Sequence, residues 1–422
     1  MNIKLPQRAW YQDDEVEISF PASWEVQVLR MRGHDAPAVT GAQIAKSLQN
    51  PIGTKPLREL ARGKKEVAIA FDDLSRPTRS ALIVPYVLEE LKAADIPDGN
   101  IRFISALGAH SAMDGAGYRK KLGAEVLDRF AVYNHNCYDN CTYVGKTSRG
   151  TPISINSEFM SCDLRLGIGS ILPHPRMGFG GGGKIVLPGL AHMDTILANH
   201  SLPRGSTAYM GNIAGNQIAE DIAEAAKLAG LDFKVDVLIN HRLETTALFA
   251  GDPLLVHQEG VKLAKGHYAT EAVTGADIVV VNTYAKANEC VIAMAVASPL
   301  LEGQGGDLVL ITNTPEGQVI HYLMGYFGKH HSGSRFPVIM KSFPPGVKRM
   351  TILAPYVDRA GERWFGTPGS ITWKKTWDEV RGMLEETYDK RAKVAVIPDG
   401  TMQYFPALRS FQTKNEPQRC CS

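Results

Sequence analysis

The sequence is organised around Pro173-His174-Pro175-Arg176-Met177-Gly178-Phe179-Gly180-Gly181-Gly182-Gly183-Lys184, which runs on through a short apolar run to Pro188-Gly189. Five of the seven residues from Gly178 to Lys184 are glycine, so few side chains shield the backbone there. Successive N–H groups in such a loop can turn toward one anion. A lysine that leaves the loop suits phosphate binding, or amine chemistry if desolvation lowers its pKa. Two prolines and the apolar run argue against a flexible linker, and we therefore expect an ordered loop that carries chemistry.

The glycine loop matches most of the phosphate-binding loop of nucleotide triphosphatases, G-x-x-x-x-G-K-[ST], from Gly178 to Lys184. The match fails at Ile185, which stands where that loop has the hydroxyl group that holds Mg²⁺. Pro173-His174-Pro175 is also a poor end for the strand that should precede such a loop. The sequence therefore disfavours a triphosphatase, and leaves open a phosphate-ligand or nucleotide-binding protein that uses the glycine loop.

A β–α–β pattern precedes the loop. It consists of a buried strand, a helix with apolar residues at helical spacing, and a second strand, in the ranges 65–73, 81–94 and 101–107. In open α/β sheets, ligands gather at the C-terminal ends of the strands. We therefore expect Asp73, Arg76 and His110, which follow the two strands, to lie at one rim of a sheet.

The remaining pattern predicts more α/β structure. The first part of the chain holds a half-buried strand, a long helix and a further strand, at 16–20, 206–229 and 235–240. After a short helix and a plausible hinge between Gly251 and Gly275, a second series of strands follows at 277–282, 308–312, 351–355 and 394–398. Thr376 and Glu379 form a capping box at the start of a helix.

The predicted fold class is α/β, with two α/β domains and a cleft between them. The N-terminal domain, 1–265, carries the glycine loop, and the C-terminal domain covers 275–399. The tail, 400–422, could pack back on the N-terminal domain.

Composition supports a soluble globular enzyme. The chain has 422 residues, 44% of them hydrophobic and 21% charged, and a net charge of +2, which gives no electrostatic case for nucleic acid or an anionic membrane. There is no run of eighteen apolar residues and no signal peptide at Met1, so we expect a cytoplasmic protein. Six cysteines are too sparse for a disulfide framework. His135, Cys137 and Cys141 could suggest zinc, but no second pair accompanies them, and reduced thiols are preferred for all six, including Cys420 and Cys421 in the tail.

Three blocks of sequence together point to a family. The first is Pro-His-Pro with the glycine loop ending in Lys184, followed by Pro188-Gly189 and Asn199-His200. The second is Asp73-Leu74-Ser75-Arg76-Pro77-Thr78, and the third is Ala106-Leu107-Gly108-Ala109-His110. In order and spacing these blocks resemble the lactate racemases that use the nickel-pincer nucleotide, and the similarity runs through most of the chain.

The resemblance implies a racemase or epimerase of a 2-hydroxy acid that works by reversible hydride transfer. The hydride route avoids a dianion, because the carboxylate opposes loss of a proton from Cα, and it needs two bases, one for each enantiomer's hydroxyl. His110 and His174 match the two catalytic histidines. Lys184 matches the lysine that carries the cofactor, the Ni(II)-pyridinium-3,5-bisthiocarboxylic acid mononucleotide, and His200 matches the protein ligand of the nickel. Cofactor biosynthesis enzymes are the implied partners.

The resemblance also implies the contacts of the cofactor and the substrate. The segment matching the nucleotide-contacting residues is Asp73, Leu74, Ser75 and Arg76, joined by Gly180, Gly181, Gly182 and Gly183 of the loop. Arg76 is also expected near the substrate.

Two departures from the family concern the substrate. Ser111 stands where an arginine often follows the catalytic histidine, and Lys286 and Glu289 stand where lactate racemase has a glutamine and a lysine for the substrate carboxylate. Glu289 would repel a carboxylate unless it is protonated or paired, whereas Lys286 could bind one. We therefore expect a larger or polyhydroxylated acid in place of lactate. Two alternatives stay open: hydride transfer on another alcohol with the same cofactor, and a phosphate-ligand or nucleotide-binding protein without racemase activity.

Overall fold

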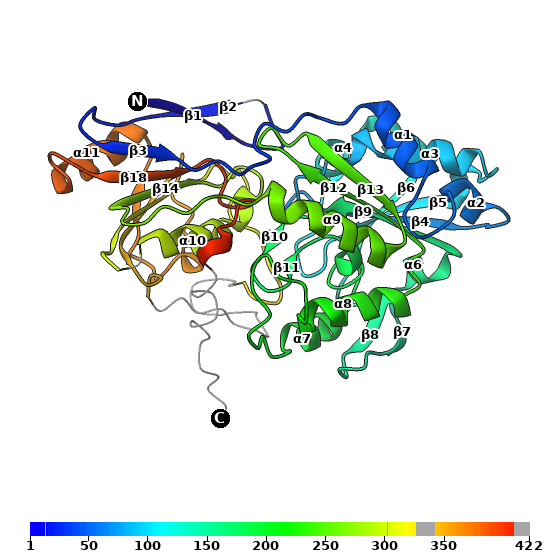
Figure 1. Ribbon diagram of the computed structural model, residues 1–422. Helices are drawn as coiled ribbons and strands as arrows, with labels where there is room; N and C mark the ends of the chain where they lie inside the picture. The colour runs from blue at the N-terminus through cyan, green and yellow to red at the C-terminus, as the bar shows by residue number, and fades with distance from the viewer. Residues whose placement is uncertain (13, 302, 326–341, 409–422) are drawn as a thin grey trace.

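Two six-stranded sheets lie side by side in the computed structural model, which describes residues 1–12, 14–301, 303–325 and 342–408 (Figure 1). In the first sheet the strands follow the order β13 (Thr245–Gly251), β12 (Phe233–Ile239), β9 (Leu164–Ser170), β4 (Val67–Asp72), β5 (Ile101–Ala106) and β6 (Ala131–Asn134). All neighbours in it are parallel except β12 and β13. In the second sheet, which is parallel throughout, the order is β17 (Thr372–Lys374), β16 (Val347–Leu353), β15 (Gly306–Ile311), β14 (Ile278–Asn282), β18 (Lys393–Ile397) and β3 (Glu25–Val28).

Both halves have their own helices (Figure 1). Those around the first sheet are α1 (Gly41–Gln49), α2 (Leu57–Ala61), α3 (Val84–Lys92), α4 (Gly115–Leu122), α5 (Ala124–Arg129), α6 (Ser157–Ser161), α7 (Met193–His200), α8 (Gln217–Leu228) and α9 (Pro253–His267). The second sheet is accompanied by α10 (Val291–Ala297) and α11 (Trp377–Thr387). Three two-stranded pairs complete the structure: β1 (Asn2–Gln7) with β2 (Asp14–Ser19), β7 (Cys141–Lys146) with β8 (Pro152–Asn156), and β10 (Pro173–His174) with β11 (Gly178–Phe179).

Strand β4 shows how the first sheet makes room for the glycine loop. All six of its residues are buried, as expected for a parallel strand covered on both faces. Its large side chains, Ile69 and Phe71 among them, belong to the core cluster that includes α3, whereas Ala68 and Ala70 belong to the cluster that includes Ile185 and the segment after the loop. Since alanine leaves space, the 3₁₀ turn η3 (Gly182–Ile185) packs against β4 on that face.

The strands β1, β2 and β3 lie with the second sheet, whereas the sequence prediction placed them in an N-terminal domain of 1–265. β3 pairs in parallel with β18, and Gln7 donates to Asn282 at the end of β14. The Trp377 ring of α11 donates to the Ser19 carbonyl and packs edge-on against Phe20. The chain therefore starts beside the second sheet and then crosses to the first. A domain boundary drawn at one point along the sequence cannot describe this path.

Most other predicted elements are confirmed. The strands of both series appear, and Thr376 and Glu379 form the predicted capping box of α11. The helix predicted over 206–229 is wrong in its first half: α8 begins after Asn216, whose side chain accepts from two backbone amides. The predicted tail contact is present at Tyr404, whose ring packs against Phe179, while residues 409–422, with Cys420 and Cys421, lie outside the described residues.

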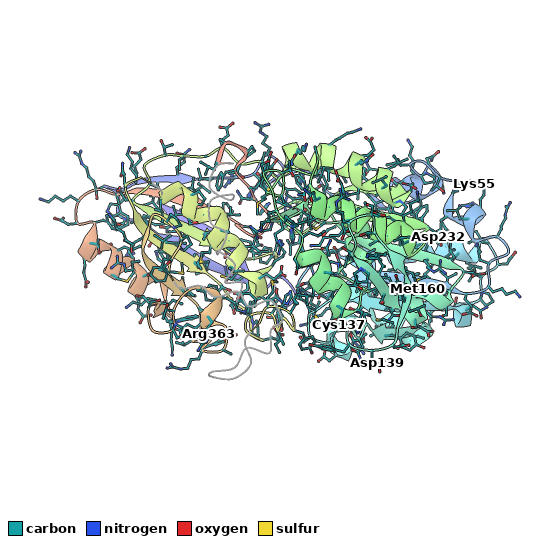
Figure 2. The ribbon with its side chains drawn as sticks, turned by 90° about the horizontal axis from the view of Figure 1, so that it is seen from below. Lys55, Cys137, Asp139, Met160, Asp232 and Arg363 are labelled. Atoms are coloured by element: carbon teal, nitrogen blue, oxygen red, sulfur yellow. The ribbon has the colours of Figure 1, made fainter. Side chains whose placement is uncertain are left out.

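Four of the six cysteines lie in the described part of the chain. Cys137, Cys141, Cys162 and Cys290 are free thiols, and both ring nitrogens of His135 are engaged by Ala191 and Asn156, so His135 is not offered to a metal. Among the described residues, none of the helices combines the length and apolar character that crossing a bilayer requires. In Figure 2, Lys55 and Arg363 mark the first-sheet and the second-sheet half.

The placement of the N-terminal strands generates a stability prediction. Phe20→Ala should cost about 3–5 kcal/mol of unfolding free energy, because a buried aromatic ring is removed. Hydrogen exchange should rise in the peptides of β14 and β18 while the peptides of β4 and β5 keep their protection. Loss of protection in β4 and β5, with β14 and β18 unchanged, would return residues 2–28 to the first sheet.

Candidate active site

The candidate site lies where strand ends of the two sheets meet. Asp73 follows β4, His110 lies four residues after β5, and His174 lies four residues after β9. From the second sheet, Lys286 and Glu289 follow β14 through the turn η4 (Ala287–Glu289). Because the carboxyl ends of parallel strands share one edge, the fold collects these side chains from segments far apart in sequence.

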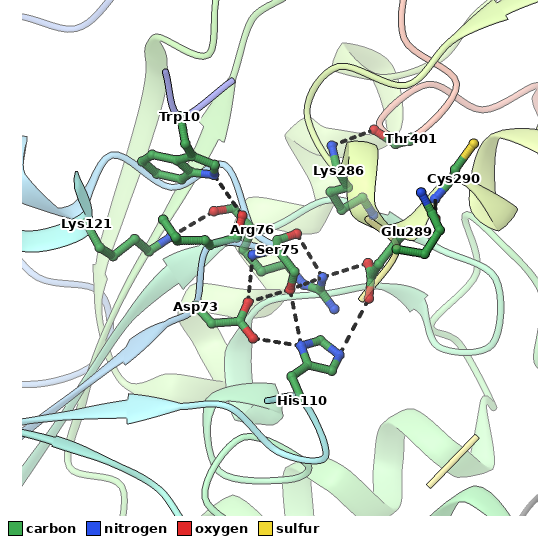
Figure 3. A network of polar contacts seen from close by, with 12 residues as sticks. Trp10, Asp73, Ser75, Arg76, His110, Lys121, Lys286, Glu289, Cys290 and Thr401 are labelled. Atoms are coloured by element: carbon green, nitrogen blue, oxygen red, sulfur yellow. Dashed lines mark hydrogen bonds and ion pairs between the residues drawn. The ribbon is translucent and has the colours of Figure 1, made fainter. Parts of the chain in front are cut away.

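His110 is oriented by a carboxylate. Its Nδ1 lies 2.6 Å from Asp73 Oδ2 and 3.3 Å from Ser75 Oγ, and its Nε2 lies 3.6 Å from Glu289 Oε1 (Figure 3). Burial would raise the pKa of Asp73, but His110, Arg76 and the Ser75 hydrogen bond lower it well below its usual range. An ionised carboxylate at Nδ1 places a ring proton on Nδ1, and Nε2 faces the Glu289 carboxylate of the second sheet.

An ion pair between Arg76 and Glu289 joins the two halves. Arg76 Nη1 lies 2.7 Å from Glu289 Oε2, and the Arg76 carbonyl accepts from Lys121 Nζ at 2.8 Å (Figure 3). Lys121 is fully buried and lies 2.6 Å from Asp72 Oδ1. Burial would raise the pKa of Glu289, but Arg76, His110 and Lys286 lower it on balance. Glu289 is thus an ionised, paired carboxylate.

Lys184 and Lys286 lie close to Arg76, so three cationic side chains gather in this region. The pKa of Lys184 falls to about 7, first because of burial and then because of Arg76 and Lys286. The pKa of Lys286 falls to about 8 by burial and the charge of Arg76. Burial, Lys184, Lys286 and Arg76 hold the pKa of His174 well below its usual range. The arrangement favours an anionic ligand and makes a substantial fraction of the Lys184 amine neutral at pH 7.

His174 is held in the opposite tautomer to His110. Its Nδ1 accepts from the backbone N–H groups of Arg176 and Met177, at 3.2 and 3.3 Å, which assigns the proton of the neutral ring to Nε2. The short β10–β11 pairing brings Gly178 back beside His174. Gly178 has φ +79°, and a Cβ there would lie 2.0 Å from the Asn212 carbonyl oxygen, so glycine is required for this return.

His200 is the last residue of α7 and has the properties of a metal ligand. Burial, Arg176 and Lys184 lower the pKa of His200 to about 3, so the ring is neutral. Its Nδ1 is buried and makes no hydrogen bond of regular geometry among the described residues, although the Ile196 carbonyl one turn back in α7 acts on the ring and raises its pKa slightly. The His200 carbonyl accepts from Arg176 Nη2 at 2.5 Å. A neutral imidazole with a free nitrogen is an ordinary ligand for nickel, zinc or copper.

A cavity of about 340 Å³ opens beside His110. Its walls come from both halves and include Leu74, Ser75, Asn288, Asn313 and Thr314. Leu74 is held there because its carbonyl accepts from Trp10 Nε1 at 2.7 Å. The cavity offers space for a ligand longer than three carbons.

The structure brings the predicted site residues to one region and adds residues that the motifs did not reveal. His321 is 8% exposed and forms an isolated antiparallel β-bridge with His110 through the backbone. The two ring centroids lie 5.2 Å apart. Asp236 accepts from the Gly182 N–H of the glycine loop, and the His257 ring contacts the Gly180 carbonyl. The only sequence signal for Asp236 was a charged residue in an apolar strand, and His321 had none.

Comparisons with known proteins agree with the resemblance seen in the sequence. Residues 11–211 match the family described as "Lactate racemase N-terminal domain". The chain is 35% identical to a lactate racemase of Lactiplantibacillus plantarum over 226 residues, 53% of each protein, and 32% identical to that of Thermoanaerobacterium thermosaccharolyticum over 241 residues, 56% of each. These matches span about half the length of the two relatives.

Two solved structures share the fold. The lactate racemase apoprotein of Thermoanaerobacterium thermosaccharolyticum has a TM-score of 0.71 at 23% identity, covering 96% of this chain and all of that one. A protein of Thermotoga maritima has a TM-score of 0.66 at 16% identity, covering 87% and 98%. The α/β fold and the similarity to lactate racemases are therefore confirmed.

The electrostatics of Lys184 give a pH prediction. In the protein without cofactor, trace acylation of Lys184 by acetic anhydride should reach half its maximal rate near pH 7, about three units below an ordinary lysine. Since the unfolded chain then holds more protons, this group makes the folded state more stable as pH rises from 7 toward 10. Peptide mass spectrometry measures the profile, with the urea-unfolded chain as control; equal midpoints in both states would contradict the desolvated site.

Proposed function

We propose that this chain, similar to lactate racemases over residues 11–211, is an isomerase that inverts the hydroxyl-bearing carbon of a 2-hydroxy acid. The observation that carries the proposal is that His110, His174, Lys184 and His200 lie in one region, where His174 is close to Lys184 and His200 and where His321 is close to His110 and His200. Asp73 orients the His110 ring with Nε2 toward the second sheet, and the cations around Lys184 suit the carboxylate of the substrate.

The substrate's proton is handled by His110 in one direction. Its Nε2 accepts the hydroxyl proton, and Asp73 at Nδ1 stabilises the imidazolium that forms. Arg76 and Lys286 are placed to hold the carboxylate, because both are cationic groups beside the same cleft. Orientation and charge are thus supplied by the protein, while hydride acceptance is not within the reach of any of these side chains.

Lys184 and His200 fit the nickel-pincer nucleotide. About half of the Lys184 amine is neutral at pH 7, and a covalent attachment requires the neutral amine. His200 presents a buried ring nitrogen that makes no hydrogen bond of regular geometry among the described residues. When bound, this cofactor supplies a reversible hydride acceptor. Asp73, Leu74, Ser75 and Arg76, with the glycines of the loop, would surround the nucleotide, and its supply would depend on the cofactor biosynthesis enzymes.

The substrate is proposed to be a longer hydroxy acid than lactate. Glu289 is ionised and paired with Arg76. It can therefore accept hydrogen bonds from substrate hydroxyl groups, and it competes with a substrate carboxylate for the Arg76 guanidinium. The cavity beside His110 gives space for the additional carbons and lines it with amide and hydroxyl groups. A polyhydroxylated acid of four to six carbons combines both requirements.

The glycine loop offers less to the competing proposal of a phosphate-binding protein. The Gly182 N–H already donates to Asp236 Oδ2 at 2.6 Å, so part of the anion cradle is filled by the protein itself. No contact among the described residues favours a free phosphate over this carboxylate.

The two histidines should differ in the direction they serve. His110→Ala and His174→Ala should each leave a folded protein with about 10²–10⁴-fold lower single-turnover rates, because each removes a proton-transfer group. Since the rings are held in opposite tautomers, each variant should be impaired more strongly toward one stereoisomer. The change of optical rotation, started from either isomer, measures this. Small and equal losses in both directions would contradict the proposed roles and the proposed function.

Glu289 should govern the choice of substrate. Glu289→Gln keeps the shape and removes the charge, which frees Arg76 for a carboxylate; kcat/KM for lactate relative to a C4–C6 polyhydroxy acid should rise about tenfold, as about 1.4 kcal/mol would produce. The comparison uses one panel of acids for wild type and variant, and Glu316→Gln, at the cavity rim, is the matched control. An unchanged ranking of substrates would show that Glu289 does not select the substrate.

A further inference from the structure

An ion pair buried in β12 lies directly under the glycine loop. Lys234 Nζ is 2.5 Å from Asp236 Oδ1, and the side chains of Lys234 and Asp236 are 1% and 0% exposed. Burying two charges costs several kcal/mol per ion before their attraction is counted, and an apolar pair is often as stable. The pair therefore calls for a reason other than core stability.

The reason lies at the second oxygen of the carboxylate. Asp236 Oδ2 accepts from the Gly182 N–H at 2.6 Å, so one carboxylate joins Lys234 to the loop. A Cβ at Gly181 would lie 3.1 Å from this oxygen, which shows how closely the loop approaches it. Glycine loops turn backbone N–H groups toward an anion, and here the anion belongs to the protein.

A second contact holds the loop from α9. His257 Nε2 lies 3.0 Å from the Gly180 carbonyl, and burial lowers the pKa of His257, so the neutral ring donates from Nε2. Gly182 has φ +54°, and a Cβ there would lie 2.7 Å from the His257 ring. The loop is thus held by its amide on one side and by its carbonyl on the other.

This anchoring sets where Lys184 leaves the loop. Lys184 lies two residues beyond Gly182, its N–H donates to the Gly181 carbonyl at 3.1 Å, and its carbonyl accepts from Gly189 at 3.1 Å. The turn that starts at Gly182 therefore carries the orientation imposed by Asp236 directly to the Lys184 side chain, which lies near Arg76, Lys286 and Glu289.

We propose that Asp236, neutralised by Lys234, is a positioning residue for Lys184: an internal anion that closes the glycine loop and keeps the Lys184 amine desolvated in the cleft. The consequence for cofactor attachment rests on the proposed function, whereas the closure of the loop does not.

The decisive comparison uses two double variants without cofactor. Lys234→Met with Asp236→Asn and Lys234→Met with Asp236→Ala both remove the two buried charges, but only asparagine keeps an oxygen for the Gly182 N–H. With asparagine, the acylation midpoint of Lys184 should stay near that of wild type. With alanine, it should rise by at least one pH unit toward an ordinary lysine, because the loosened loop exposes the amine to water.

Two further measurements separate positioning from general destabilisation. Amide exchange in the peptide covering 178–187 should become about tenfold faster in the alanine variant only. Asp307→Asn, which removes a buried charge paired with Arg349 in the second sheet, should lower stability and leave both Lys184 readouts unchanged. A wild-type midpoint and wild-type exchange in the alanine variant would overturn the proposal.

If the alanine variant does not fold, His257→Leu tests the same anchoring from α9. Loss of the donor to Gly180 should raise both loop exchange and the Lys184 midpoint, and no change in either would overturn the proposal. Because these readouts need no cofactor, they stand apart from the proposed function. The two proposals can fail separately. If the midpoint shifts in the variants but wild-type Lys184 carries no adduct after co-expression with cofactor biosynthesis enzymes, the positioning role is supported and only the proposed function is rejected.

Discussion

The ion pair between Arg76 and Glu289 is the interaction on which the site depends, because it joins strand ends of the two sheets. Arg76 lowers the pKa of Lys184 and of Lys286, and Glu289 partly offsets the effect on both. The same pair keeps Glu289 ionised 3.6 Å from His110 Nε2. One contact between the halves thus affects the charge state of the Lys184 amine, the Lys286 amine and the Glu289 carboxylate together.

The division between the two sheets separates two kinds of residue. Asp73, His110, His174, Lys184 and His200 all fall within residues 11–211, the part that matches the lactate racemase N-terminal domain. Lys286 and Glu289 lie outside it, on the second sheet. The groups proposed to handle the proton and the cofactor therefore belong to the matched part, while the two groups proposed to select the substrate belong to the other half.

Much of this arrangement could be predicted from sequence, for a local reason. The apolar run at 67–71 predicts β4, and strand ends predict where Asp73 and His110 lie, because parallel strands share an edge. Pairings between distant segments could not be predicted. β3 joins β18 across more than 360 residues, and Gly182 meets Asp236 from 54 residues away. A charged residue in a buried strand shows that a partner exists but does not say which one, and nothing near His321 indicates that it packs against His110.

The intact mass of the protein, purified after co-expression with the cofactor biosynthesis enzymes, tests the central claim most directly. The account predicts a covalent adduct of nucleotide mass, found by peptide mapping on Lys184 and absent from Lys184→Ala, with nickel retained in wild type and lost in His200→Ala. An unmodified Lys184 in a folded wild-type chain, under conditions that load a lactate racemase expressed in parallel, would contradict it.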